Sequence, residues 1–278
     1  MLLSGFVKSI TQILKQFKYI KMKIALFSDI HANLPALEAF FKDVDSRKPD
    51  AIYCLGDLVG YNIWPNEVVN EIRKRNIPTI AGNYDFGIGR TSNDCGCAYK
   101  TDLEKANGSV SISLTNSLMK DEERAYLRTL PAHIKVEFQL NEDKLNLLLV
   151  HGSPRKINEY LFEDREEKSL LRIMHDAHAD IMCFGHTHKP YHRILEETDR
   201  DKTRYRHAIN LGSVGKPKDN DPRGCYVMLH IHENSSILYP ESVQVEFIRF
   251  EYDIEKAAKA VEESILPNDY AENLRRGY

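Results

Sequence analysis

Short apolar runs alternate with amphipathic stretches along the first half of the chain. The runs 23–28, 50–55 and 77–81 are largely apolar, which is typical of strands buried on both faces. Between them, apolar residues recur at helical spacing over 34–47 and over a segment that starts at Pro65, a residue favoured in the first turn of a helix. This order predicts a βαβαβ unit, with a parallel sheet and right-handed crossovers.

The second half of the chain predicts a second sheet. Residues 100–130 have a mostly helical pattern, and then "HIKVEFQL" and "KLNLLLV" flank the turn "NED" as the two strands of a hairpin. A helix over 163–178 leads to the strand "DIMCF", and "RYRHAINL", "GCYVMLHI" and "SVQVEFIRFEYD" predict three more strands before two closing helices. With no internal repeat and no linker, the pattern predicts an α/β fold of two packed sheets flanked by helices, as one domain over residues 22–278.

Residues 1–21 form an amphipathic extension ahead of this pattern. Its apolar residues recur at helical spacing with lysines between them, and Lys8 interrupts any apolar core of a signal peptide. Three interpretations stay open: the functional start is Met22, the extension docks as a helix on the domain or a partner, or it lies as a helix on a membrane surface.

Composition and charge narrow the class of protein. The formal net charge is −3 over 278 residues, so no basic surface indicates nucleic-acid binding, and no run reaches the roughly 18 apolar residues of a membrane span. The odd number of cysteines, with Cys54 and Cys183 inside apolar runs, indicates reduced thiols and a cytoplasmic location. The pair Cys95 and Cys97 lacks a second pair at zinc-site spacing. We expect a soluble protein with a small-molecule partner, and a homo-oligomer is left open.

Ligand-type residues follow five of the predicted strands. In open α/β sheets, ligands bind outside the carboxyl ends of the strands, so these side chains are expected along one edge. Their oxygen and nitrogen donors exceed the four that one structural zinc needs, and they fit two ions that share a bridging carboxylate. Such a donor set favours manganese, with iron, nickel, zinc or cobalt as alternatives. The seven residues are Asp29, His31, Asp57, Asn83, His151, His186 and His188.

The motif set DxH, GD, GN, HG and GHTH resembles the calcineurin-like metallophosphoesterases, from Met22 to the C-terminus. The stretches "SDIHANLPALEA", "HGSPR" and "NLGSVGKPKDNDPRG" resemble the YfcE-like phosphodiesterase branch of that superfamily. The resemblance implies a two-sheet β-sandwich flanked by helices (αββα, metallo-dependent phosphatase-like) and a binuclear metal centre. It also implies a phosphodiesterase, with a protein or small-molecule phosphomonoesterase, or a non-catalytic scaffold of the same fold, as alternatives.

The resemblance further implies residue roles. A metal-bridging hydroxide is the expected nucleophile, which attacks phosphorus in line while the ions hold the charge of the phosphoryl oxygens. Asp57, Asn83 and His186 are the residues that it implies for catalysis. It assigns the ligands of one ion as Asp29, His31 and His188, those of the other as Asn83, His151 and His186, and the bridge as Asp57.

Two further residues are candidates for substrate binding. Arg155 follows the His151 turn and is expected to bind a phosphate oxygen, with a solvated loop arginine as the alternative. Asn33 follows His31 and is expected to contact substrate, with a helix cap as the alternative.

The sequence departs from the family pattern at Tyr84. Many members have a histidine after the GN pair, which protonates the leaving group, and a cysteine is tolerated there in the YfcE-like branch. Because tyrosine titrates near 10, it is a poorer proton donor than imidazole at neutral pH. Substrates with stable leaving groups, such as aryl esters and nucleotide anhydrides, are therefore favoured.

A chain that begins at Met22 is expected to fold and to turn over substrate like the full-length protein, because every candidate ligand lies downstream of it. Expression of both chains, followed by circular dichroism and a rate assay, tests this. An insoluble or inactive shorter chain would show that residues 1–21 belong to the domain.

Overall fold

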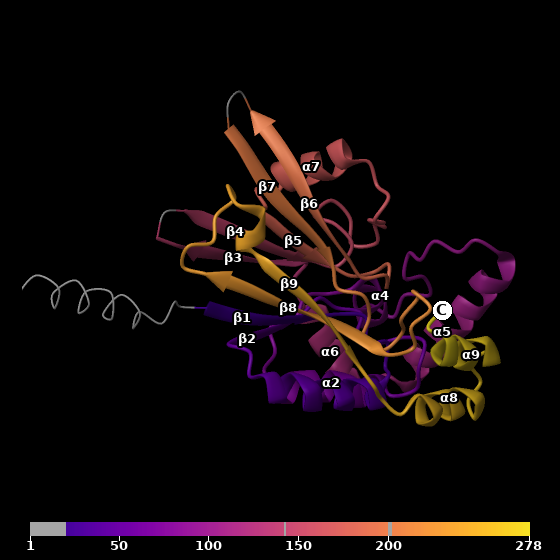
Figure 1. Cartoon of the computed structure of the whole chain (residues 1–278). Coiled ribbons are helices and arrows are strands. Elements are labelled where there is room, and N and C mark those ends of the chain that lie inside the picture. Colours follow the sequence, from indigo (N-terminus) through magenta and orange to yellow (C-terminus); the bar gives the residue numbers. More distant parts are fainter. Residues whose placement is uncertain (1–20, 142, 200–201) are drawn as a thin grey trace, which may run out of the picture.

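The strands form two sheets in the computed structural model, which describes residues 21–141, 143–199 and 202–278 (Figure 1). The first sheet has the strand order β2-β1-β8-β9, and the second has the order β3-β4-β5-β7-β6. The first is built from β1 (Lys21–Phe27), β2 (Ala51–Cys54), β8 (Gly224–His232) and β9 (Gln244–Phe250). The second is built from β3 (His133–Gln139), β4 (Lys144–Val150), β5 (Ile181–Phe184), β6 (Tyr191–Asp199) and β7 (Lys202–Asn210).

Strand β1 is buried on both faces because the first sheet lies between two apolar layers. Ile24 and Leu26 point into the core between the two sheets, whereas Ala25 and Phe27 point into a core shared with helices. Alternate residues of a strand face opposite sides of its sheet, so a strand that is covered on both sides is apolar throughout.

Strand β4 repeats this arrangement in the second sheet. Leu147 and Leu149 join the core between the sheets, and Leu148 and Val150 pack in a third core with helix α7. The order of layers is therefore helices, sheet, sheet, helix. The predicted α/β fold of two packed sheets with flanking helices is confirmed.

Helices cover the outer faces of both sheets. Figure 1 shows α2 beneath the first sheet and α7 over the second. Apolar residues of α2, α3, α8 and α9 share the core of the first sheet. The helices are α2 (Leu34–Arg47), α3 (Pro65–Lys74), α4 (Asn83–Gly89), α5 (Asp102–Leu118), α6 (Asp121–Thr129), α7 (Glu167–Asp176), α8 (Ile254–Glu262) and α9 (Asn268–Arg276), with a 3₁₀ turn η1 at Pro240–Ser242.

Most predicted elements occur close to their expected positions, and three differ, one of them helix α4, which the pattern did not predict. Residues 77–81 form only an isolated bridge, between Cys54 and Thr79, so the prediction of a third strand is wrong. Pro78 has no N–H to donate to a ladder, and only its carbonyl is used, by the Cys54 amide at 3.1 Å. Strand β6 was not expected, since its polar residues resemble a loop.

The predicted parallel sheet is only partly realised. β1 pairs with β2 in parallel but with β8 in antiparallel orientation, so the first sheet is mixed. In the second sheet, β5 runs parallel to both β4 and β7, while the outer strands β3 and β6 pair antiparallel. The parallel strands β1, β2, β4 and β5 all end at the candidate site.

Residues 1–20 of the amphipathic extension lie outside the described residues, whereas its last residue, Lys21, begins β1. Among the helices described, none has the length and apolar character that crossing a membrane requires.

Candidate metal centre

Six of the seven candidate ligands lie in turns that follow strands, at one end of the two sheets, and Asn83 begins a helix. Asp29 and His31 come from the turn between β1 and α2, and Asp57 from the turn after β2. Asn83 opens α4, while the second sheet supplies one histidine after β4 and two after β5. The expectation that strand ends would gather these side chains agrees with this geometry. All seven side chains are buried.

Asp29, His31 and His188 form the first group, with their ligand atoms within 4.8 Å of one another. Nε2 of His31 lies 3.1 Å from Nε2 of His188. Asp29 Oδ1 lies 3.2 Å from His188 Nε2 and 3.8 Å from His31 Nε2. Three ligand atoms thus face one small volume.

Hydrogen bonds on the other ring atoms fix the tautomers in this first group. Nδ1 of His31 donates to the Val59 carbonyl at 3.0 Å, and Nδ1 of His188 donates to the Lys216 carbonyl at 2.5 Å. Both Nε2 atoms of the neutral rings therefore carry lone pairs, which cannot hydrogen-bond to each other. A cation between them would relieve this repulsion, so the donor set fits a metal ion.

Hydrogen bonds also orient the Asp29 carboxylate. Its Oδ2 accepts from the Ser28 hydroxyl at 2.6 Å and from the His186 amide at 3.1 Å. Its buried Oδ1 has no hydrogen-bond partner within the described residues. A buried carboxylate oxygen left without a donor is costly in a folded protein, and a metal ion would satisfy it.

Asp57, His151 and His186 form the second group. Nδ1 of His151 donates to the Leu55 carbonyl at 2.8 Å, and Nε2 then faces Asp57 Oδ2 at 3.3 Å and Asn83 Oδ1 at 3.1 Å. His186 Nε2 is buried and makes no hydrogen bond in the part of the chain that the structure describes. The oxygens of Asp57 and Asn83, together with Nε2 of His186 and of a deprotonated His151, fit a second ion.

One oxygen of Asp57, a member of the second group, also lies close to a histidine of the first. Its Oδ2 lies 3.6 Å from His31 Nε2 and 3.3 Å from His151 Nε2. Its Oδ1 accepts from the Tyr84 amide at 2.9 Å, which fixes the carboxylate plane. This is the position that a bridging carboxylate requires.

The electrostatics of the site keep His151 protonated and the other imidazoles neutral. Burial lowers the pKa of His31 to about 3, and burial with the nearby His151 lowers that of His186 to about 4. Burial also lowers the pKa of His151, but the charge and hydrogen bond of Asp57 outweigh it and raise the value to about 10. Burial raises the pKa of Asp57, and the charge and hydrogen bond of His151 outweigh it in turn. Without metal, His151 and Asp57 form an ion pair beside neutral histidines.

Left-handed backbone positions most of these side chains. This conformation is rare for residues other than glycine, costs roughly 1–3 kcal/mol per residue and concentrates at functional sites. The candidate ligands with positive φ are Asp29 (56°), His31 (50°), Asp57 (53°), His186 (66°) and His188 (59°).

Asp85 supports the site and was not recognised in the sequence. Its two carboxylate oxygens accept from the Leu58 and Gly82 amides, each at 2.9 Å. It thereby joins the turn that carries Asp57 to the start of α4. Burial, with the nearby charge of Asp57, raises the pKa of Asp85 to about 7. Its place two residues after Asn83 was the only signal in the sequence.

The two candidate substrate-binding residues are engaged elsewhere. Asn33 caps helix α2 through the Ala36 amide at 3.2 Å and donates to the Gly215 carbonyl at 2.8 Å. The guanidinium of Arg155, half exposed, forms an ion pair with Glu159. These contacts match the alternatives of a helix cap and a loop arginine, and substrate contact by either residue stays a prediction.

Aromatic and thiol groups surround the two groups of ligands. The Tyr84 ring lies 5.4 Å from that of His31, and burial raises the Tyr84 pKa well above its usual range. The thiol of Cys97 lies 3.5 Å from Asn83 Nδ2, whereas Cys95 contributes its backbone carbonyl to the same nitrogen at 2.8 Å. Cys97 therefore borders the site.

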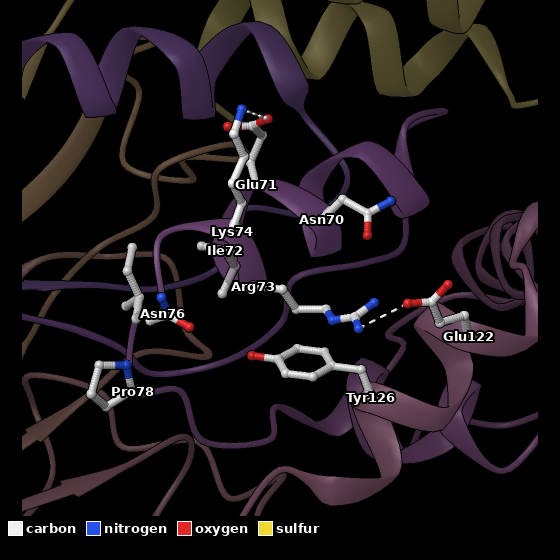
Figure 2. Close-up of a pocket in the computed structure, with 10 residues that line it drawn as sticks. Asn70, Glu71, Ile72, Arg73, Lys74, Asn76, Pro78, Glu122 and Tyr126 are labelled. Carbon is white, nitrogen blue, oxygen red and sulfur yellow. Dashed lines mark ion pairs between the residues drawn. The ribbon is translucent and has the colours of Figure 1, made fainter.

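A cleft of about 750 Å³ is separate from this centre (Figure 2). Figure 2 shows Arg73 between Glu122 and Tyr126. An ion pair of 2.9 Å joins Arg73 to Glu122, and the guanidinium lies 5.4 Å from the Tyr126 ring centroid. No candidate ligand lines this cleft, so it is not part of the metal centre.

Comparisons with known proteins agree with this arrangement. The family model described as the calcineurin-like phosphoesterase superfamily domain matches residues 22–234. An uncharacterized protein of Methanocaldococcus jannaschii is 32% identical over 271 residues, which cover 93% of this chain and 99% of that protein. A metallophosphoesterase from Sphaerobacter thermophilus superposes with a TM-score of 0.68 at 28% identity, over 93% of this chain and 100% of its own. A UDP-2,3-diacylglucosamine hydrolase of Vibrio cholerae is 25% identical over 200 residues, 63% of this chain and 83% of that protein.

Substitution of the shared carboxylate is expected to weaken both metal sites. Asp57→Asn should lower bound manganese at both positions, because it removes the charge on which the two groups converge, whereas His186→Ala should empty mainly one. Elemental analysis after dialysis gives the number of manganese ions per chain. His175→Ala, a substitution of an exposed histidine, is the matched control. Full occupancy in Asp57→Asn would contradict the bridging assignment.

Metal binding at pH 7 is expected to release one proton from His151. With a pKa of about 10, this imidazole is protonated in the metal-free protein, and a metal ion needs its neutral form. Affinity should therefore rise with pH up to about 10 and level off above it. Calorimetric titration in two buffers of different ionisation enthalpy measures the proton directly. Equal apparent enthalpies in both buffers would show that no proton leaves.

Proposed function

The chain belongs to the calcineurin-like phosphoesterase superfamily, and we propose that it is a phosphodiesterase that works with two divalent metal ions. The family is one of metal-dependent phosphoester hydrolases. The observation that supports a two-ion centre best is the position of Asp57 Oδ2, 3.6 Å from Nε2 of His31 in the first group and 3.3 Å from Nε2 of His151 in the second.

In this proposal the two groups of side chains hold one ion each. When bound, the ions supply Lewis acidity to the phosphoryl oxygens and to the attacking water. Manganese is the proposed ion, because the donors are oxygen and imidazole nitrogen without thiolate. Asp29, His31 and His188 would hold the first ion, Asn83, His151 and His186 would hold the second, and Asp57 would be shared by the two sites.

The residues of the chain orient the reaction through their own contacts. The His151 and His31 rings are held by carbonyls on the turn after β2, so the ligand atoms of both sheets keep their relative positions. Asn83 is held at its nitrogen by the Cys95 carbonyl, which leaves its oxygen directed to His151. Preorganised groups of this kind need little rearrangement when charge develops on the phosphoryl oxygens.

In this proposal the site lacks an effective proton donor for the leaving group. The Tyr84 hydroxyl is buried and makes no hydrogen bond to a described residue, and burial raises its pKa further from neutrality. This supports substrates whose leaving groups depart without a proton. Two other groups are candidates for the proton donor. His207 pairs with His192 at 3.0 Å and lies opposite Ile181, at the end of β5 away from the ligands, whereas Cys97 contacts Asn83 and is the nearer alternative.

A cytoplasmic location is part of the proposal. All five cysteines are free thiols, and three of them, Cys54, Cys183 and Cys225, are fully buried. Free thiols are usual in reducing compartments.

The purified, manganese-loaded protein is expected to hydrolyse bis(p-nitrophenyl) phosphate faster than p-nitrophenyl phosphate. Removal of metal by a chelator should abolish both activities, and manganese should restore them. Release of p-nitrophenol reports both rates. A faster monoester reaction would favour the phosphomonoesterase alternative. Absence of turnover at full metal content would favour the non-catalytic scaffold.

The rate is expected to fall as the leaving group becomes more basic. Tyr84→His should speed alkyl esters by up to about 100-fold, the lower range for positioned acid–base catalysis, and change aryl esters little. Metal content must be measured with the rates, because the new imidazole can bind an ion. Equal wild-type rates for alkyl and aryl esters would show that another group donates the proton, and loss of the alkyl rate in Cys97→Ala would identify it.

A further inference from the structure

Two aromatic side chains, Tyr160 and Phe162, form a platform that starts at a candidate metal ligand and ends at the surface. The Tyr160 ring centroid lies 4.1 Å from that of His186. The Phe162 ring stacks on Tyr160, with centroids 5.7 Å apart and an angle of 16° between the planes. His186 is buried, Tyr160 is partly buried, and Phe162 is 45% exposed. The platform therefore leads from the candidate site into solvent.

Leu161, between the two rings in sequence, anchors the platform. Its side chain is buried in the third core, and its carbonyl accepts a hydrogen bond from the Tyr191 hydroxyl at 2.9 Å. The residues before and after Leu161 stack on each other outside that core. Burial of the middle side chain thus holds the two aromatic rings on the side of the metal centre.

The platform is also fixed to the turn that carries the ligand after β4. A Cβ on Gly152, in that turn, would lie 2.5 Å from the Ile157 carbonyl oxygen and 2.8 Å from the Glu159 amide nitrogen, so the two backbones touch. The Tyr160 hydroxyl accepts a hydrogen bond from the Ala98 amide at 3.4 Å. Backbone contacts on both sides therefore set the position of the rings relative to the ligands.

Phe162 presents a flat apolar face to solvent. It belongs to none of the three apolar cores in the described part of the chain, and of the rings described only that of Tyr160 stacks on it. Single exposed apolar residues are common and need no ligand, but this ring continues a stack that begins at His186. Aromatic faces bind other planar π systems in offset stacks, with little dependence on which ring is bound.

We propose that Tyr160 and Phe162 determine substrate specificity, by selecting phosphoesters in which an organic group on phosphorus carries a planar aromatic ring. That ring stacks on the exposed face of Phe162. The shared chemistry is a planar π system, supplied by an aryl group or by a nucleobase. The inference rests on the proposed function for the position of the phosphorus, whereas the ring contact is measured by binding alone.

Binding of three phosphonates to the manganese-loaded protein, measured by calorimetry, tests the inference. 2-Phenylethylphosphonate and 2-cyclohexylethylphosphonate have the same charge and chain length and differ in whether the ring is planar, and methylphosphonate has no ring. The wild type should bind the phenyl compound about 3-fold or more tighter than the cyclohexyl compound, as expected for aromatic stacking beyond the burial of apolar area. Phe162→Leu should abolish this preference, and Phe162→Tyr should keep it.

Tyr239→Leu is the matched control, because it also removes an exposed aromatic ring. Tyr239 is 58% exposed and follows β8, whose last residue, His232, pairs with Lys21 at the start of β1, away from the ligands. This variant should bind all three phosphonates like the wild type. The inference is overturned if Phe162→Leu keeps the preference for the phenyl compound. Equal weakening of all three phosphonates would also overturn it, and would show that the platform only shields His186 from water.

The source of the planar ring is distinguished with the 5′-methylenephosphonate analogue of thymidine. Binding that is tighter than that of 2-phenylethylphosphonate, and equally dependent on Phe162, identifies a nucleobase. Binding that is no tighter, with the same dependence, identifies an aryl group. Tight binding that Phe162→Leu leaves unchanged would overturn the platform, because the base would then be bound elsewhere.

A measurement on the wild type keeps the inference testable if a variant fails to fold or to load metal. In the zinc-loaded protein, which is diamagnetic, 2-phenylethylphosphonate should shift the ring resonances of Phe162 in the NMR spectrum more than 2-cyclohexylethylphosphonate does. Equal shifts would overturn the platform. Phenyl-selective binding in a protein that hydrolyses no ester would support the platform and reject the proposed phosphodiesterase. Ester hydrolysis without this selectivity would do the reverse.

Discussion

Three imidazole N–H groups that donate to backbone carbonyls hold the centre of this molecule together. His31 and His151 donate to carbonyls in the same turn after β2, although they follow strands of different sheets. His188 donates to the segment after β7. Each hydrogen bond orients an imidazole ring and also connects one loop to another. The same bonds therefore determine both how the two sheets are positioned and where the ligand atoms point.

The apolar cores of the fold offset the free energy of folding that this arrangement costs. Five candidate ligands lie on left-handed backbone, and the Nε2 acceptors of His31 and His188 face one another without a donor. Both features destabilise the metal-free protein. Against them stand three apolar cores, of which the one between the sheets lies directly behind the turns. Strands that are buried on both faces are thus a requirement of the site as well as of the fold.

The sequence predicted the candidate ligands better than it predicted their supports. Six of the seven candidate ligands follow parallel strands, and the carboxyl ends of such strands meet at one edge, so local pattern was enough to group them. The contacts of Asp85 and Lys216 depend on loops distant in sequence, which no local pattern reveals. The same limit explains β6, an edge strand whose polar residues pair only because β7 lies beside it. Residues 77–81 have the apolar pattern of a strand, but Pro78 has no N–H to donate to a neighbouring strand, and only an isolated bridge forms.

The contact between Gly82 and Asp57 has a consequence for how such a protein can diversify. A Cβ on Gly82 would lie 2.1 Å from Asp57 Oδ1, so no residue with a side chain fits at this position unless Asp57 moves. The turns of the centre are interlocked in this way and offer no room for variation. The loops around 96–98 and 158–160, by contrast, meet through a few hydrogen bonds, such as that from the Asn158 side chain to the Gly96 carbonyl at 2.7 Å. New specificities in this architecture would therefore arise by exchange of the outer loops, while the chemistry stays fixed beneath them.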